Sequence, residues 1–168
     1  MFKRRHPLST KDAKQLIAKV QSLPWFTRSL SKNVKIELAE LQSGEKLYLF
    51  DGSPTLVELS DGALIPTLQA KDLLSNIVKV VVDMGAVPHI TNGADIMVPG
   101  IREIRGACQI NDIVVIVDEK HYKEIAVARA LKSSVEVMQG EKRGKAFENL
   151  HYVGDKVWKA MQHLSATT

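Results

Sequence analysis

The feature that most constrains the fold is a series of short apolar segments between residues 79 and 153, separated by glycines and turn residues. Short strands at intervals of about 8–15 residues are typical of a small β barrel or sandwich. The strands are expected at residues 80–82, 96–98, 112–118, 124–131 and 146–151. The most apolar run, residues 113–117, is far shorter than the roughly 20 residues that cross a bilayer, so no membrane association is predicted.

The first 78 residues predict a mixed helix and strand unit. A capping residue at Ser9 or Thr10, apolar residues at helical spacing and Pro24 together predict one helix. The apolar period then changes to two, and Asp61-Gly62 between two apolar runs predicts a hairpin with a type I′ turn. Pro66 indicates that the second hairpin strand ends early or lies at an edge. Strands are expected at residues 34–38, 46–50, 55–60 and 63–68, and a short helix at residues 70–76.

These patterns predict an α+β protein with two units. The boundaries expected from the sequence are an α+β domain at residues 1–78, a β-rich domain at residues 79–153, and a C-terminal helix and tail at residues 154–168. Asp155 is the expected cap of that last helix. We expect the helix to remain with the second domain, because Trp158 and Met161 must bury their apolar face.

Charge is distributed unevenly along the chain. Residues 1–35 contain nine lysines and arginines but only one acidic residue, whereas residues 36–78 contain two basic and seven acidic residues. A basic N-terminal segment (residues 1–35, the basic leader) followed by an acidic-to-neutral remainder of the chain suggests an N-terminal element that binds a polyanion. A solvated, lysine-rich helix face is the alternative, and the charge pattern alone does not distinguish the two.

No group of residues has the pattern of a catalytic or metal site. The five histidines lack ligand spacing, and Cys108 is the single cysteine, so neither a metal nor a cofactor is expected. The segment from Gly140 to Lys145 has the wrong spacing for a phosphate loop, and Ala146 stands where that motif needs serine or threonine. The sequence therefore predicts a protein that is not an enzyme.

Basic residues beside glycines are the remaining candidates for binding. They form two clusters, Arg102 with Arg105, and Lys142 and Arg143 with Lys145. A nucleic-acid backbone can approach a glycine closely and bind the cations beside it. Basic residues that only keep a loop soluble would give the same pattern.

The second unit resembles a PUA domain, the small RNA-binding pseudobarrel of pseudouridine synthases and archaeosine transglycosylases. The similar residues are 80–83, 91–101, 111–119, 126–130 and 140–151, in order over about 75 residues. A narrower resemblance covers nearly the whole chain. The segments at residues 66–68, 93–100 and 147–152, with Asp155 and Trp158, are similar to the malignant T-cell amplified sequence (MCT) family and to ligatin, and the chain looks like an archaeal-type relative.

This resemblance implies a cytoplasmic translation factor that binds RNA, engages tRNA and the small ribosomal subunit during initiation or recycling, and meets an SUI-domain protein in trans. A ribosome-assembly factor is the main alternative, and a component of RNA modification is a weaker one. By resemblance, RNA would contact the short helix at residues 87–92, the glycine loop and the final strand. With the two charge clusters, the predicted RNA-binding residues are Thr91, Asn92, Gly93, Ala94, Asp95, Arg102, Arg105, Lys142, Arg143, Lys145 and Asn149.

Overall fold

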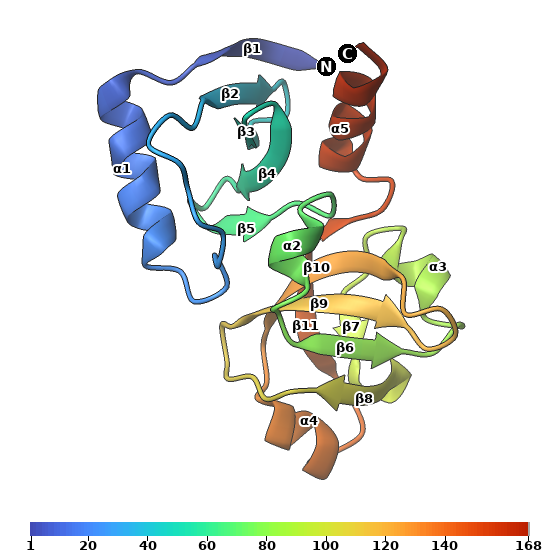
Figure 1. The fold of residues 1–168 in the computed structure, drawn as a ribbon. Helices are drawn as coiled ribbons and strands as arrows, with labels where there is room; N and C mark the ends of the chain where they lie inside the picture. Colours follow the sequence, from blue (N-terminus) through green and yellow to red (C-terminus); the bar gives the residue numbers. More distant parts are fainter. Residues whose placement is uncertain (168) are drawn as a thin grey trace. The chain divides into compact units, whose positions relative to one another are not determined.

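The structure, a computed structural model, describes residues 1–167 and has the predicted α+β architecture. It divides into two compact units (Figure 1). Residues 1–76 form the first together with residues 159–168, and residues 77–158 form the second. Among the described residues, no helix has the length and apolar character needed to cross a membrane.

The first unit contains a five-stranded antiparallel sheet in the order β1-β2-β3-β4-β5. Its strands are β1 (Phe2–Pro7), β2 (Ile36–Leu41), β3 (Lys46–Phe50), β4 (Ser53–Glu58) and β5 (Leu64–Pro66). Its helices are α1 (Thr10–Gln21) and the short α2 (Lys71–Leu74). The prediction for Pro66 is confirmed, because Pro66 ends β5 and β5 is an edge strand. An edge is where proline is tolerated, since its nitrogen has no hydrogen to donate to a neighbouring strand.

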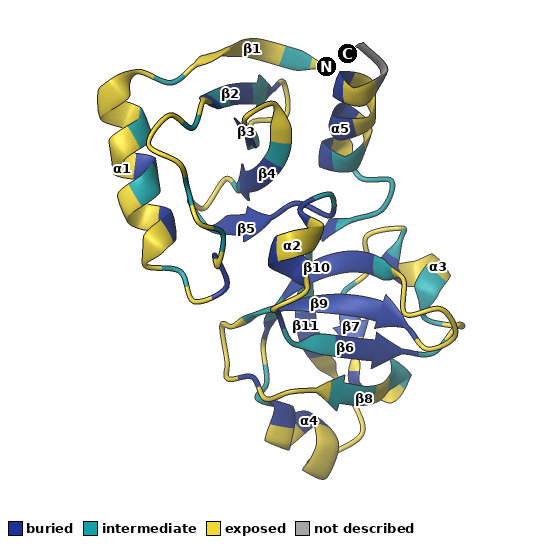
Figure 2. Cartoon of the chain, in the orientation of Figure 1, coloured by how far each residue is buried: buried dark blue, intermediate teal, exposed yellow. Residues whose placement is uncertain are grey.

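Helix α1 begins as its sequence predicts. The Ser9 hydroxyl accepts a hydrogen bond from the Asp12 backbone N–H at 3.1 Å, and Leu16 and Val20 are the buried residues of the apolar stripe. The lysine-bearing face of α1 is exposed, as Figure 2 shows.

The strand β1 was not predicted, because its sequence shows no apolar alternation. It pairs antiparallel with β2, and ion pairs join Arg4 to Glu40 at 2.6 Å and Arg5 to Glu37 at 2.9 Å. The hydrogen bond from Arg4 lowers the pKa of Glu40. Two of the cations in the basic leader are therefore paired within the sheet, which weakens the interpretation that this whole segment faces a polyanion.

The two Asp-Gly pairs form different turns. At Asp51-Gly52 both residues have positive φ (51° and 83°), and the flanking Phe50 and Ser53 are paired, as in a two-residue type I′ hairpin. At the predicted site only Gly62 has a positive φ, 87°, and the longer loop closes by its N–H donating to the Leu59 carbonyl at 2.8 Å. The hairpin prediction is confirmed, but the type I′ turn at residues 61–62 is wrong.

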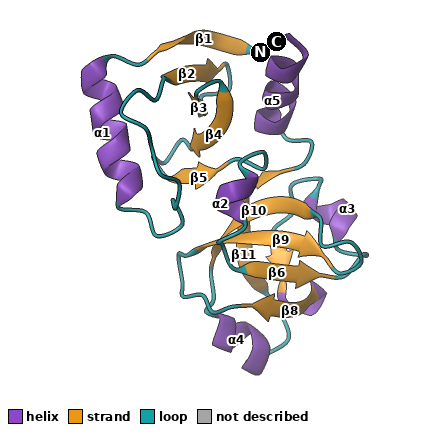
Figure 3. Ribbon diagram, in the orientation of Figure 1, coloured by secondary structure: helices purple, strands orange, loops and turns teal. Residues whose placement is uncertain are grey.

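The second unit is built on a six-stranded mixed sheet in the order β7-β11-β10-β9-β6-β8, in which only the β6–β9 pair is parallel. The strands are β6 (Lys79–Val82), β7 (Ile96–Met97), β8 (Ile101–Arg105), β9 (Ile113–Asp118), β10 (Glu124–Ala130) and β11 (Lys145–Tyr152). Between them lie α3 (Val87–Ile90), the 3-10 turn η1 (Val98–Gly100) and α4 (Ser134–Gln139). Figure 3 shows these short helices at the ends of the strands. The core contains Phe147 and small or β-branched residues from β6, β9 and β10.

The last helix, α5 (Lys156–Thr167), begins where Asp155 predicts, because the Asp155 carboxylate accepts the Trp158 backbone N–H at 2.7 Å. The unit to which most of α5 belongs differs from the one expected from the sequence. Residues from Lys159 onward belong to the first unit, where the His163 ring lies 6.3 Å from the ring of Phe2. The expectation that the whole helix remains with the second domain is therefore wrong.

Candidate nucleic-acid interface

The short helix α3 is positioned by the turn that leaves β6. The Asp83 carboxylate accepts the Ala86 backbone N–H at 2.8 Å, which starts the helix, and Ile90 anchors the helix in the core at 2% exposure. Thr91 ends the helix, with its hydroxyl donating to the Val87 carbonyl at 3.0 Å. The residues that follow, Asn92, Gly93 and Ala94, are exposed.

Gly93 occupies a conformation and a space that favour glycine. Its φ is +97°, and its N–H donates to the Ile90 carbonyl at 3.0 Å. A Cβ added there would lie 3.0 Å from the Tyr152 hydroxyl oxygen. The fold itself therefore favours glycine here, independently of any ligand that approaches the loop.

Asn149 of β11 ties this loop to the sheet. Its side-chain amide donates to the carbonyls of Ile90 and Ala94, each at 3.0 Å, while its backbone N–H donates to the Asp95 carboxylate at 2.9 Å. Residue Leu150 is an extra residue in the register between β10 and β11, and such bulges redirect neighbouring side chains. The Oδ1 atom of Asn149 is buried and has no hydrogen-bond partner within the described chain.

Lys145 is the cation that the fold brings to this loop. Its Nζ lies 3.2 Å from Asp95 Oδ2, and its side chain is 62% exposed. The other oxygen of the Asp95 carboxylate accepts the Asn149 backbone N–H. One carboxylate therefore orients both the loop and the lysine, and the ammonium group remains accessible to an anion.

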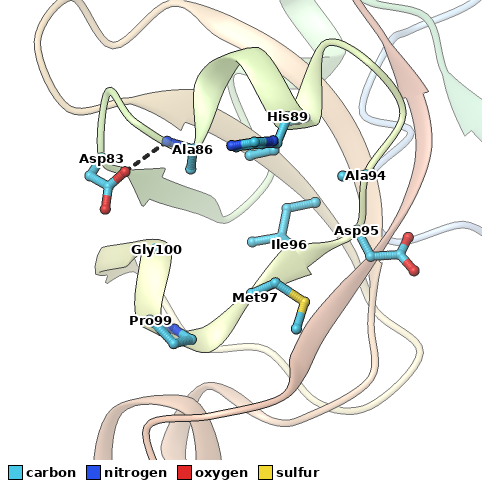
Figure 4. Close-up of a pocket in the computed structure, with 10 residues that line it drawn as sticks. Asp83, Ala86, His89, Ala94, Asp95, Ile96, Met97, Pro99 and Gly100 are labelled. Carbon is cyan, nitrogen blue, oxygen red and sulfur yellow. Dashed lines mark hydrogen bonds between the residues drawn. The ribbon is translucent and has the colours of Figure 1, made fainter.

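A cavity of about 450 Å³ lies between α3, β7 and η1. Figure 4 shows His89 above it, Pro99 and Gly100 below, and Ile96 and Met97 between them. The residues that line it are mainly apolar, with the carboxylates of Asp83 and Asp95 and the imidazole of His89 as polar exceptions. An apolar recess with a few polar groups at its border can accommodate a flat heteroaromatic ring such as a nucleobase.

The other predicted cations do not line this cavity. Arg102 pairs with Glu119 at 3.0 Å and lies 3.9 Å from Asp83, and Arg105 pairs with Glu103 at 3.0 Å. Arg143 pairs with its neighbour Glu141 at 2.8 Å.

Lys142 has a structural contact of its own. Its Nζ donates to the carbonyls of Val137 and Met138, at 3.0 and 2.6 Å, and so caps the end of α4.

The structure brings seven of the eleven predicted RNA-binding residues together around the Gly93 loop, namely Thr91, Asn92, Gly93, Ala94, Asp95, Lys145 and Asn149.

The site contains no cluster suited to a metal or a nucleophile. Among residues 1–167, no three histidine, cysteine or carboxylate side chains gather as a ligand set. Cys108 is 2% exposed, and burial raises the pKa of its thiol, which disfavours the reactive thiolate.

Of the ten residues that line the cavity, only Ala94 and Asp95 were predicted site residues, and Asp83, His89 and Met97 are among the eight that were not. All three stand in segments that carry the family resemblance, residues 80–83, 87–92 and 93–100, but nothing in the sequence singled out their side chains. The backbone of residues 83–100 folds around the cavity, so these side chains meet only through tertiary structure.

The fold and site define a protein with a PUA domain. The PUA domain model matches residues 78–153, and a model described as a domain of unknown function (DUF1947) matches residues 4–71. A solved structure of a PUA domain from Aeropyrum pernix has a TM-score of 0.80 with this chain, at 29% identity, and covers 96% of this chain and 92% of its own.

Relatives narrow the assignment. MJ1432 of Methanocaldococcus jannaschii is 38% identical over 161 residues, covering 94% of this chain and 96% of its own. Translation machinery-associated protein 20 of Schizosaccharomyces pombe is 29% identical, with coverages of 84% and 83%. Malignant T-cell-amplified sequence 1 of Rattus norvegicus is 26% identical, with coverages of 80% and 76%. The chain belongs to the MCT-like family of PUA proteins, as its sequence predicts.

Proposed function

We propose that this chain is a non-enzymatic RNA-binding factor of the cytoplasmic translation machinery, which engages tRNA and the small ribosomal subunit. The PUA domain and the names of the relatives, one of them translation machinery-associated, support an RNA-binding role in translation. A partner with an SUI domain would act in trans.

The observation that supports the location of the RNA site is the arrangement around Gly93. The loop presents exposed backbone from Asn92 to Ala94, and Lys145 lies beside it with an accessible ammonium group. The cavity next to the loop is large enough for a nucleobase, while the lysine is placed for a phosphate. An RNA end or an unpaired nucleotide would enter the cavity with its backbone over Gly93.

A second group of phosphate contacts lies on α1 of the first unit. Lys11 and Lys14 are exposed and have no ion pair within the described chain, whereas Lys19 lies 3.9 Å from Glu58. Lys11 and Lys14 are therefore among the cations of the basic leader that remain available to a polyanion, whereas Arg4 and Arg5 are paired.

Binding of tRNA at several salt concentrations tests this proposal. If about six phosphates are engaged, affinity should fall roughly a thousandfold between 50 and 200 mM salt. Lys145→Ala should reduce the salt slope by about one unit without altering the fold. Lys156→Ala, which removes another exposed lysine, is the matched control and should leave the slope unchanged. Salt-insensitive binding, or equal slopes for the two variants, would contradict the proposed site.

Sedimentation of the tagged protein with ribosomal particles tests which particle the protein binds. Co-migration with mature small subunits is expected from the proposal. Co-migration with precursor particles of the large subunit would instead indicate a ribosome-assembly factor. Chemical modification of a base when the protein is incubated with bulk tRNA would indicate a component of RNA modification.

A further inference from the structure

The loop between β9 and β10 presents an aromatic side chain in an unfavourable backbone conformation. Tyr122 has a φ of +52° and is 46% exposed. Glycine or asparagine normally occupies such a left-handed position, and a bulky side chain there is uncommon. Folding alone would therefore favour a different residue at position 122.

The loop is held rigidly from within. The buried carboxylate of Asp118 accepts backbone N–H groups from Lys120, His121 and Lys123, at 2.9, 2.6 and 3.1 Å. The Tyr122 N–H donates to the Asp118 carbonyl at 3.1 Å. The tyrosine thus projects from a fixed turn, which lowers the entropy that a ligand must overcome on binding.

Arg105 of β8 fixes the tyrosine ring. Its guanidinium carbon lies 4.2 Å from the Tyr122 ring centroid, and one of its nitrogens donates to the Tyr122 hydroxyl at 2.7 Å. Glu103 orients the same guanidinium through a hydrogen bond at 3.0 Å. The guanidinium therefore lies over the ring, and both side chains remain about half exposed, Tyr122 at 46% and Arg105 at 54%.

Two lysines flank this surface. Lys120 and Lys123 are exposed, and no ion pair involving them occurs within residues 1–167. The acids nearby are Glu103 and Glu119, which pair with Arg105 and Arg102, and Asp118 and Glu124 at the two ends of the loop. The unpaired ammonium groups of Lys120 and Lys123 can therefore contact an anionic ligand that also has a flat ring.

The loop is connected to the candidate site through Arg102. The guanidinium of Arg102 lies 3.0 Å from Glu119, in the loop, and 3.9 Å from Asp83, which lines the cavity. The Glu119 N–H donates to the Val82 carbonyl at 2.9 Å. The start of the tyrosine loop and the cavity therefore lie at the same end of β6 and β9, whereas Arg105 pairs with Lys79 at the other end of β6. One strand of RNA that contacts both would run along β8.

We propose that Tyr122 and Arg105 form a second RNA contact, which stacks a base of single-stranded RNA outside the cavity while Lys120 and Lys123 bind the adjacent phosphates. Aromatic and arginine planes stack on bases of any identity, so the contact adds affinity without sequence preference. This inference rests on the proposed RNA-binding function and adds a site to it.

The test compares Tyr122→Gly with Tyr122→Phe in the full chain, using fluorescent oligoadenylate and a blunt RNA duplex as probes. Tyr122→Gly should weaken oligoadenylate binding about fivefold to 150-fold, the range measured for loss of one stacked base. Its thermal midpoint should equal or exceed that of the parent, because glycine accepts the positive φ. Tyr122→Phe should bind oligoadenylate within about threefold of the parent, since its ring remains available for stacking. Duplex binding should not change for either variant.

Parent-like oligoadenylate binding by Tyr122→Gly would overturn the proposal, as would an equal loss for the duplex. If Tyr122→Gly unfolds, Tyr122→Asn replaces it, because asparagine also tolerates this conformation. Lys145→Ala is measured in parallel. If Lys145→Ala behaves as expected and Tyr122→Gly binds like the parent, this inference alone fails. If neither variant changes binding, the proposed RNA site fails as well.

Discussion

Replacing Asn149 tests how the candidate site is held together. Asn149→Ala removes the two hydrogen bonds from the side-chain amide to the carbonyls of Ile90 and Ala94. Each such bond contributes about 0.5–1.5 kcal/mol, so the loop should lose about 1–3 kcal/mol of local stability. The Ile90 carbonyl keeps its bond from the Gly93 N–H, which places the expected cost toward the lower end.

Native-state hydrogen exchange measures this loss directly. The amides of Gly93 and Ala94, which donate to the Ile90 and His89 carbonyls, should exchange about 5- to 150-fold faster in Asn149→Ala. Asn149→Asp is the matched isostere and should be worse, because it directs a carboxylate oxygen at two carbonyl oxygens. Unchanged exchange at both amides, or an aspartate variant as stable as the parent, would refute this account of the loop.

Three further predictions concern stability. Gly93→Ala should lower the free energy of unfolding by about 1–2 kcal/mol, because alanine is strained at a positive φ. In the double variant with Tyr152→Phe, thermal unfolding should show recovery only of the part of this loss that comes from contact with the Tyr152 hydroxyl. The backbone N–H of His121 lowers the pKa of Asp118, so its carboxylate stabilises the fold above the usual pKa of about 4 and loses that effect as pH falls through the lowered value. Asp118→Asn should flatten the acid side of a plot of urea midpoint against pH. Truncation after Trp158 should destabilise the first unit by roughly 3 kcal/mol or more, since two large buried side chains are lost, and urea unfolding should show an earlier transition.

Local signals in the sequence predict the elements whose ends are chemically marked. Ser9 and Asp155 cap the helices that follow them, and Pro66 lies at an edge. The capping box formed by Ser133 and Glu136 was an available signal for α4 that the sequence analysis missed. The strands β1 and β8 lack a clear apolar alternation, and pairing with β2 and β6 makes them strands.

The candidate site was predictable only in part. The resemblance identified the Gly93 loop, Lys145 and Asn149, and the structure gives these residues a common network with Asp95. It could not show that Asn149 holds carbonyls more than 50 residues away, because no local pattern encodes such a contact. Charge clustering could not reveal that Lys142 caps α4, because only the folded helix places the carbonyls of Val137 and Met138 together beside the ammonium group.

The most direct test of the central claim is a titration of isotopically labelled full-length protein with tRNA, followed by backbone amide chemical shifts. RNA that binds over Gly93 and enters the adjacent cavity should cause the largest changes at residues 89–97 and 145–149, and Lys145→Ala should reduce them at the same RNA concentration. Saturable binding that leaves both segments unshifted, with changes confined to other residues, would contradict the proposed site.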